Sequence, residues 1–98
     1  MSSSGAQTAA PPAFDPEQAW RLHPQVALRD ESFGALAYHY GNRRLVFLRS
    51  RTLVDLVQSL ERFDSAGAAL DALVGAGKRD AYSLALARLA ASEVIDGR

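Results

Sequence analysis

The sequence contains no cysteine, and this absence excludes several kinds of chemistry. Disulfides, thiolate metal sites, iron–sulfur clusters and cysteine nucleophiles all require that residue. There are only two histidines, His23 and His39, and His39 has no carboxylate or second histidine nearby at a spacing typical of metal ligands. The sequence also lacks a G-x-S-x-G nucleophile motif and a complete phosphate-binding loop. Spacing alone leaves a nucleophile–base pair open, but no motif supports one, so we expect a protein that is not an enzyme and that carries no metal or cofactor.

Excess charge and long apolar runs are lacking as well. Eleven basic and eleven acidic residues give a net charge of +0, whereas a general nucleic-acid binder usually carries an excess of Lys and Arg. No stretch approaches the roughly 20 apolar residues that a membrane span needs. The N-terminus has neither the basic start nor the apolar segment of a secretion signal. The sequence thus predicts a cytoplasmic protein that contacts neither nucleic acid nor membrane.

The chain has 98 residues, which is enough for one domain. Residues 1–19 are mostly small and polar, include paired prolines, and show no apolar periodicity. Such a composition buries too little surface to offset chain entropy, so it predicts a disordered polar tail. Residues 20–98 are then expected to form a single domain. Trp20, at its start, is expected to pack a terminus rather than recognise a ligand.

Three strands are predicted, over residues 26–31, 34–40 and 45–49. The segment 31–34 suits a hairpin, and Gly41-Asn42 indicates a turn because both residues tolerate positive φ. The strands should therefore form an antiparallel meander. Alternation in the middle strand divides its side chains between two faces. One face has Ala35, Ala37 and His39, and the other has Leu36, Tyr38 and Tyr40.

Three helices are predicted after the strands. The first has Thr52 and Asp55 in the positions of a capping box and an apolar face that runs from Leu53 to Phe63. The second should follow an N-cap at Asp64. Strands grouped before helices indicate an α+β fold, with the helices on one face of the sheet.

The C-terminal part of the chain gives the end of the second helix and the whole of the third. Gly75 and Gly77 are expected to end the second helix through a left-handed conformation. The third helix should begin near Asp80 and end at residue 91 or 92. The apolar pair Val94-Ile95 is then expected to fold back as a clasp.

The third strand is predicted to be a sheet edge without the proline, bulge or inward charge that usually protects one. Such an edge can accept an extended peptide as an additional strand, although an ordinary core strand would look similar. The third helix has an unusually broad apolar arc, including Ala81, Tyr82 and Ala85, that suits either a groove wall or simple packing. The nearby arginines suit either a solvated face or the binding of phosphates or acidic side chains; they are Arg43, Arg44, Arg49 and Arg51.

Two segments carry a family resemblance: HPQVALR at residues 23–29 and FGALAYHYGNRRLVFL at residues 33–48. They resemble the mycofactocin biosynthesis chaperone family, and the similarity continues through the helices to residue 95. This family belongs to the PqqD-like recognition elements of ribosomally made, modified peptides. The resemblance implies a small winged-helix-like domain of three antiparallel strands followed by three helices.

The resemblance also implies a function. Proteins of this kind are adaptors that bind the leader region of a precursor peptide as a fourth strand, beside the third strand and over a groove walled by the third helix. The partner enzyme would be a radical S-adenosylmethionine maturase, which this cysteine-free chain cannot itself be. The implied peptide-binding residues are Arg44, Leu45, Val46, Phe47, Leu48, Arg49, Arg79, Tyr82 and Leu86.

Two alternatives remain open from the residues alone. A winged-helix DNA-binding regulator would use the same layout, but Ser83, Ser92 and Glu93 are not base-reading side chains. A structural dimerisation module would pair two open edges about a two-fold axis into a six-stranded sheet. A homodimer of that kind is compatible with the adaptor hypothesis, because a free edge is hazardous when no peptide is bound.

Overall fold

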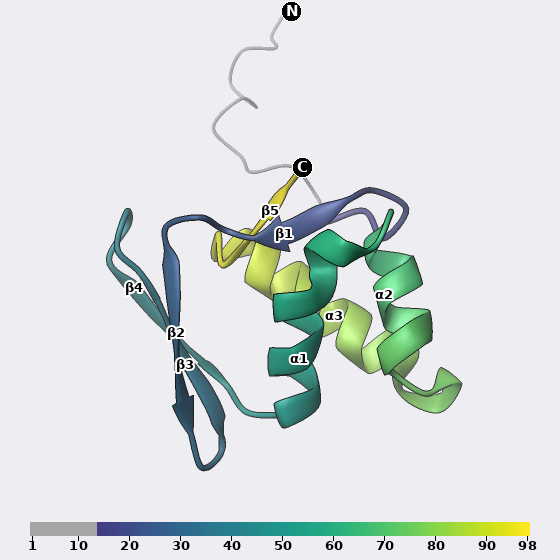
Figure 1. The fold of residues 1–98 in the computed structure, drawn as a ribbon, viewed down its shortest axis with the longest axis horizontal. Coiled ribbons are helices and arrows are strands. Elements are labelled where there is room, and N and C mark those ends of the chain that lie inside the picture. The colour runs from purple at the N-terminus through teal and green to yellow at the C-terminus, as the bar shows by residue number, and fades with distance from the viewer. Residues whose placement is uncertain (1–13) are drawn as a thin grey trace, which may run out of the picture.

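The larger sheet has three antiparallel strands in the order β2-β3-β4. In the computed structural model, which describes residues 14–98, these strands are β2 (Val26–Glu31), β3 (Gly34–His39) and β4 (Arg44–Leu48). All the helices lie on one side of this sheet, and the other side faces away from the rest of the molecule (Figure 1). The predicted α+β meander is confirmed, and each strand boundary lies within one residue of its expected place.

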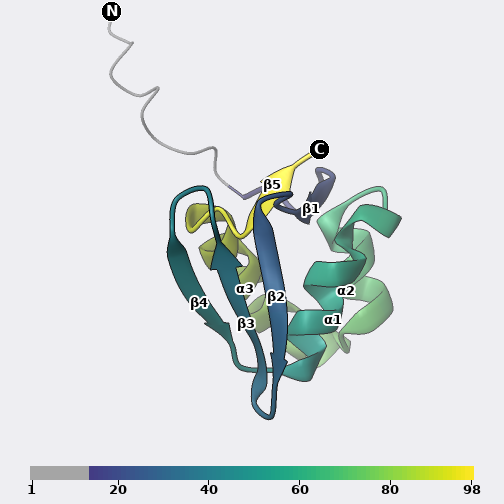
Figure 2. The same ribbon diagram turned by 60° about the vertical axis from the view of Figure 1, so that its left-hand side comes forward.

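Side-chain alternation divides the sheet into an inner and an outer face. Glu31 pairs with Gly34 across a two-residue turn, and this register places Ala35 and Ala37 on the inner face, where both are buried. Tyr38 and its β4 neighbour Leu45 lie on the outer face and are exposed. The turn of the view in Figure 2 brings this three-stranded sheet in front of the helices.

Close approach of two strands explains why position 34 is glycine. Gly34 has a φ of 146°, and a Cβ atom there would lie 2.1 Å from the carbonyl oxygen of Leu48. Any other residue would push β4 away from β3 at Leu48, the last residue of β4.

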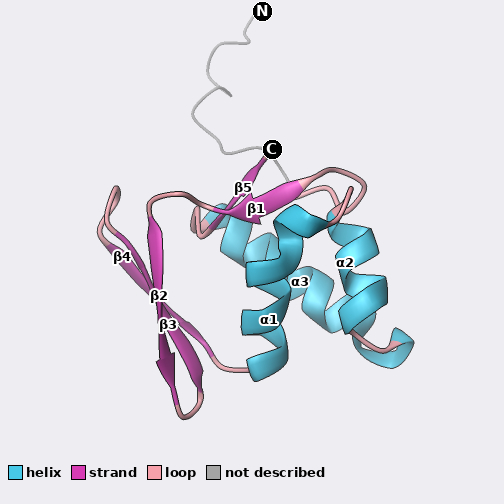
Figure 3. Cartoon of the chain, in the orientation of Figure 1, coloured by secondary structure: helices cyan, strands magenta, loops and turns pink. Residues whose placement is uncertain are grey.

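The helical half begins with α1 (Arg51–Ser59), which continues into a 3₁₀ turn, η2 (Leu60–Arg62). The helix α2 (Ala66–Leu73), a second 3₁₀ turn, η3 (Ala76–Lys78), and α3 (Arg79–Ala91) follow in that order, as Figure 3 shows. Within residues 14–98 no helix has the length and apolar character required to cross a membrane.

Serines, rather than the residues predicted, cap the first two helices. The hydroxyl of Ser50 accepts a hydrogen bond from the Leu53 amide at 3.2 Å, and that of Ser65 accepts one from Ala68 at 3.1 Å. Thr52 already lies inside α1, so the predicted caps at Thr52 and Asp64 are wrong. Both true caps have extended backbones just before the first helical residue, as N-caps require.

The predicted left-handed glycine stop of α2 is also wrong. The chain leaves the helix in an extended conformation at Val74, and Gly75 has a φ of −67°. The Val74 side chain is buried in the core, so packing of this residue sets the exit direction. The predicted bounds of α3 are confirmed to within one residue.

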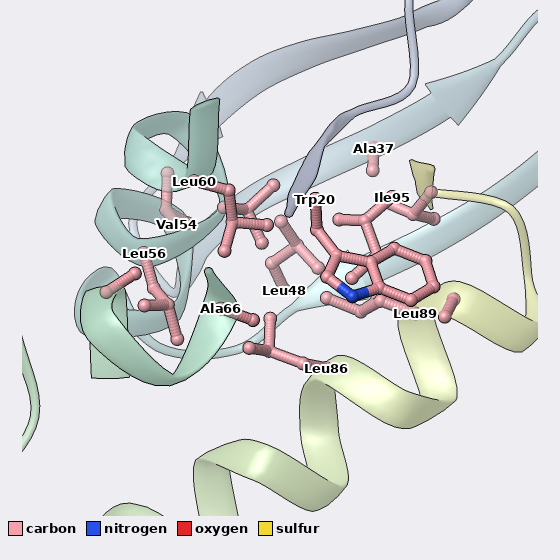
Figure 4. Close-up of a cluster of buried hydrophobic side chains, with 14 of the residues drawn as sticks. Trp20, Ala37, Leu48, Val54, Leu56, Leu60, Ala66, Leu86, Leu89 and Ile95 are labelled. Carbon is pink, nitrogen blue, oxygen red and sulfur yellow. The ribbon is translucent and has the colours of Figure 1, made fainter. Parts of the chain in front are cut away.

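The core lies between the inner face of the sheet and the helices, where α1 and α3 meet Trp20 and Ile95 (Figure 4). Its largest fully buried side chains include one each from β4, α1, η2, α2 and α3. They are Leu48, Leu56, Leu60, Leu70 and Leu86. Each removes a whole aliphatic side chain from water, which is worth roughly 1.5–3 kcal/mol per residue before the entropy cost.

A second, two-stranded sheet joins the two ends of the domain. The strands β1 (Trp20–Leu22) and β5 (Ile95–Gly97) pair in antiparallel register, and Ile95 and Val94 are buried. Glu93, with a φ of 63°, turns the chain out of α3, and the Val94 amide closes this turn on the Leu89 carbonyl at 2.9 Å. The predicted clasp is therefore confirmed, and it includes a strand that the sequence did not indicate.

Residues 14–19, which the sequence assigned to the tail, lie against the domain. The carbonyl oxygens of Pro16 and Gln18 accept hydrogen bonds from the amides of Gly67 and Ala66 at 2.7 and 2.9 Å. These amides are free N–H groups of the first turn of α2, which need partners from outside the helix. Trp20 is buried and donates its indole N–H to the Asp15 carbonyl, as its expected packing role requires. Residues 1–13 of the predicted tail lie outside the described residues.

Candidate functional site

The outer edge of β4 is open. Within residues 14–98, β4 pairs only with β3, and its other side has no neighbouring strand. Leu45 and Phe47 are the most exposed apolar residues of this strand, with relative exposures of 56% and 52%. The strand contains no proline, and its one charged residue, Arg44, is exposed at the start of the strand. It therefore keeps the features that make an edge able to pair with another chain.

Backbone hydrogen bonds show which residues of β4 present free groups at this edge. The Tyr40 amide bonds to the Gln25 carbonyl at 3.0 Å, just beyond the paired ends of β3 and β2. The even-numbered residues of β3 therefore point their backbone N–H and C=O groups toward β2. Backbone direction alternates along a strand, so the N–H and C=O groups of Ala35 and Ala37 point toward β4, where these residues pair with Leu48 and Val46. Leu45 and Phe47 alternate with Val46 and Leu48 along β4, so their N–H and C=O groups must point outward.

A shallow hollow of about 330 Å³ lies beside the end of this edge. It is formed where the chain passes from β4 into α1 and meets α3. Its lining combines hydrocarbon surface with one guanidinium group and two hydroxyls. The lining residues are Arg49, Ser50, Leu53, Ala81, Tyr82 and Ala85. The small alanines of α3 leave the space that larger side chains would fill.

Two hydroxyl groups hold the walls of the hollow together. The Ser50 and Tyr82 oxygens lie 2.9 Å apart, so one donates a hydrogen bond to the other across the junction of β4, α1 and α3. The same Ser50 oxygen accepts the Leu53 amide that starts α1. One side chain therefore fixes both the start of α1 and its distance from α3.

The structure brings together most of the predicted site residues. Arg44, Leu45, Phe47 and Arg49 are exposed along the open edge, and Val46 is half-buried. Arg49 and Tyr82 line the hollow as well. Leu48 is fully buried on the inner face, so it offers a partner neither its side chain nor an outward backbone group.

Two predicted site residues lie elsewhere. Leu86 is 0% exposed and belongs to the core, because α3 turns this position toward the sheet and α1 rather than toward the hollow (Figure 4). Arg79 does not line the hollow; its guanidinium pairs with Asp71 of α2 at 2.8 Å. The Leu86 side chain is thus part of the core, whereas Arg79 stays a predicted peptide-binding residue that lies outside the hollow.

Sequence reasoning missed Ser50 and Leu53 as parts of the hollow. Ser50 did carry a signal, since a serine directly before an apolar periodic run is a common N-cap. Leu53 was assigned to the buried stripe of α1, but its side chain is only half-buried. Ala81 and Ala85 were part of the broad apolar arc predicted for the third helix, and both line the hollow.

The arginines near β4 differ in their partners. Arg51 pairs with Asp30 at 3.3 Å and with Asp55 at 3.8 Å. Arg43, Arg44 and Arg49 form no ion pair within the described part of the chain. The guanidinium of Arg49 lies 5.2 Å from the centre of the Phe47 ring, a cation–π geometry. The open edge therefore carries positive charge at both ends, without balancing carboxylates among residues 14–98.

The two histidines support turns. His39 is buried, and its Nδ1 accepts hydrogen bonds from the amides of Gly41 and Asn42 at 3.0 and 3.1 Å. The Nδ1 of His23 accepts from the Gln25 amide at 3.0 Å. Their rings are 4.4 Å apart, but residues 14–98 contain no group of three or more side chains able to hold a metal ion.

Comparisons with known proteins agree on one family. The model of the Peptide chaperone MftB family matches residues 19–96. A Peptide chaperone MftB of Mycobacterium tuberculosis is 48% identical over 84% of this chain and 76% of its own length. One of Mycolicibacterium smegmatis is 47% identical over 91% of this chain and 88% of its own length. No solved structure gives a significant match. The chain therefore belongs to the peptide chaperone MftB family.

Proposed function

We propose that this protein is a peptide chaperone that binds the leader region of the mycofactocin precursor peptide and delivers it to a radical S-adenosylmethionine maturase. The observation that carries the proposal is the open β4 edge beside an apolar hollow. The relatives named as peptide chaperones support the same role. The protein acts as a cytoplasmic adaptor, and the chemistry belongs to the enzyme.

Strand addition explains how the edge would hold a peptide. The outward N–H and C=O groups of Leu45 and Phe47 would bond to an extended segment laid beside β4. These bonds do not depend on the side chains of the peptide, so they supply affinity for any segment that can extend. They also fix the register of the segment, because only alternate residues of β4 have free groups.

Specificity would come from the side chains of the bound segment. In an added strand, successive side chains point to opposite faces of the sheet. Every second one would thus face the helical side, where Leu53, Ala81 and Ala85 offer an apolar surface. Near the ends of the strand, Arg44 and Arg49 would favour carboxylates. The site therefore suits a leader that combines apolar and acidic residues.

An adaptor accelerates a reaction without taking part in it. By holding the peptide while the enzyme is also bound, it converts a bimolecular encounter into one with a high effective concentration. The affinity gained depends on both contacts being made at once, so the peptide site must leave another surface free for the enzyme.

The proposal is tested by titration calorimetry of the full chain with a synthetic mycofactocin precursor peptide and with a scrambled peptide of the same composition. We expect one-to-one binding of the authentic peptide with a dissociation constant in the low micromolar range or below, about −8 kcal/mol or more favourable. The scrambled peptide should give no saturable heat. Equal binding of both peptides, or of neither by the folded chain, would contradict the proposed function.

A further inference from the structure

The outer face of the sheet carries the main exposed apolar surface of the protein. Of the seven large apolar side chains that are exposed within residues 14–98, five lie on this face or in its turn. An antiparallel sheet with one solvated face ordinarily shows polar residues there. The five residues are Phe33, Tyr38, Tyr40, Leu45 and Phe47.

These side chains form one continuous patch. Across β3 and β4, Leu36 is opposite Phe47 and Tyr38 is opposite Leu45. The Phe33 ring contacts the Phe47 ring edge-on, with 5.8 Å between their centres. No helix of the described chain covers this face, because all of them pack on the other side (Figures 1 and 2). A contiguous apolar patch of this kind commonly marks a contact with another protein.

The charges around the patch indicate the character of its partner. Along the β4 border, Arg49 lies over the Phe47 ring, and neither Arg49 nor Arg43 in the β3–β4 turn makes an ion pair within residues 14–98. The carboxylate of Glu31, on the β2 border, is paired with Arg29 at 2.8 Å. A partner surface with an apolar centre and acidic residues facing the β4 border would complement this face.

We propose that the outer face of the sheet, centred on Tyr38 and Tyr40, is the docking surface for the maturase. The partner is a globular protein that presents an apolar patch bordered by carboxylates. This inference rests on the proposed function, which requires enzyme and peptide to be held together. The hollow lies on the helical side of β4 and the patch on the other side, so both partners have room.

This arrangement also places the enzyme next to the peptide. An added strand extends the sheet beyond β4, and its alternate side chains continue the outer face. An enzyme seated on Tyr38 and Tyr40 would therefore contact those side chains of the leader as well. Bound peptide would enlarge the docking surface, so peptide and maturase should each strengthen the binding of the other.

The test replaces the two tyrosines with a polar residue that suits strands, as Tyr38→Thr with Tyr40→Thr. Affinity for the purified maturase and for the precursor peptide is measured in separate titrations. We expect binding to the maturase to weaken at least tenfold, whereas binding to the peptide alone stays within twofold of the unmodified chain. The matched control is Leu73→Ser, an exposed apolar residue of α2, which should change neither affinity.

A second variant guards against loss of folding. Tyr40→Glu changes a single position that is 56% exposed, and it brings a carboxylate toward the acidic border of the partner. It should weaken maturase binding by at least the same factor, and circular dichroism should show an unchanged fold.

Three results would overturn the docking surface. One is maturase affinity within twofold of the unmodified chain in folded variants. Another is an equal loss of peptide binding, and the third is a dimer of the unmodified chain that the tyrosine changes dissolve. Failure of the proposed function would look different, because then the unmodified chain itself would not bind the peptide.

Discussion

At the scale of single residues, the Ser50 hydroxyl has two structural tasks. It caps α1 through the Leu53 amide and bonds to the Tyr82 hydroxyl of α3. Serine suits the position because a hydroxyl can accept one hydrogen bond and donate another at the same time. The width of the hollow therefore depends on a side chain that also determines where α1 begins.

Removing either hydroxyl should lower the free energy of unfolding, and the two losses should overlap because the hydroxyls bond to each other. We expect Ser50→Ala to lower the free energy of unfolding by roughly 1–2 kcal/mol, as loss of an N-cap does. Tyr82→Phe should lower it by roughly 0.5–1.5 kcal/mol, through loss of one hydrogen bond. Urea denaturation of both single variants and the double variant gives the coupling between them. The double variant should lose less than the sum, and strict additivity would show that the two hydroxyls act independently.

At the scale of elements, β4 is an edge strand whose two sets of backbone groups have different roles. The groups of Val46 point to β3 and hold the sheet together, whereas those of Phe47 point to solvent. Proline is tolerated in an edge strand only where its missing N–H would have faced solvent. Neighbouring positions in the same strand should therefore respond differently to proline.

Phe47→Pro should leave the domain folded and weaken peptide binding at least tenfold, because it removes an outward donor and places a ring against the incoming strand. Phe47→Ala is the matched control for the lost aromatic ring and should weaken binding much less. Val46→Pro should instead destabilise the domain by roughly 1–3 kcal/mol, since it removes a hydrogen bond within the sheet and leaves the partner carbonyl unpaired. Calorimetry with the precursor peptide and thermal unfolding of all three variants check these outcomes. Full peptide affinity in folded Phe47→Pro would exclude strand addition at this edge.

The sequence predicted best the elements in which apolar residues repeat at a regular spacing over several residues. Alternation over residues 34–40 identified β3 and both of its faces, and helical spacing identified α1 and α3. The strands β1 and β5 have three residues each and pair across the full length of the domain. Three residues are too few to show a period, and their pairing depends on tertiary packing. The caps were displaced by one or two residues because Ser50 and Thr52, or Asp64 and Ser65, are almost equivalent as local signals.

At the scale of the whole molecule, the protein offers two surfaces on opposite sides of one strand. The hollow and the free edge form one surface, and the patch around Tyr38 forms the other. Alternation placed Tyr38 and Ala37 on different faces, but it did not say which face the helices would cover. The predicted site residues of α3 likewise lie in different places, because the sequence does not give the orientation of this helix. The direction in which α3 crosses the sheet determined that Tyr82 lines the hollow and that Leu86 enters the core.

Pairing of the first and last strands, β1 and β5, keeps the rest of this arrangement fixed. The β1–β5 sheet joins the start of the domain to its end, and the segment before Trp20 caps α2. The peptide edge lies away from these contacts, so a strand can be added there without disturbing them. We therefore expect the domain to bind as a nearly rigid body, with the peptide added at the β4 edge.

The central claim is that a leader peptide adds to β4, and amide hydrogen exchange followed by NMR tests it most directly. Precursor peptide at saturating concentration should slow exchange at the outward amides of Leu45 and Phe47. The amides of Val46 and Leu48 already bond to β3 and should change little. The same alternation turns the amides of Leu28 and Asp30 outward at the β2 edge, so they serve as the internal control. Protection at Leu28 and Asp30 instead, or saturated binding without protection at Leu45 and Phe47, would contradict the account.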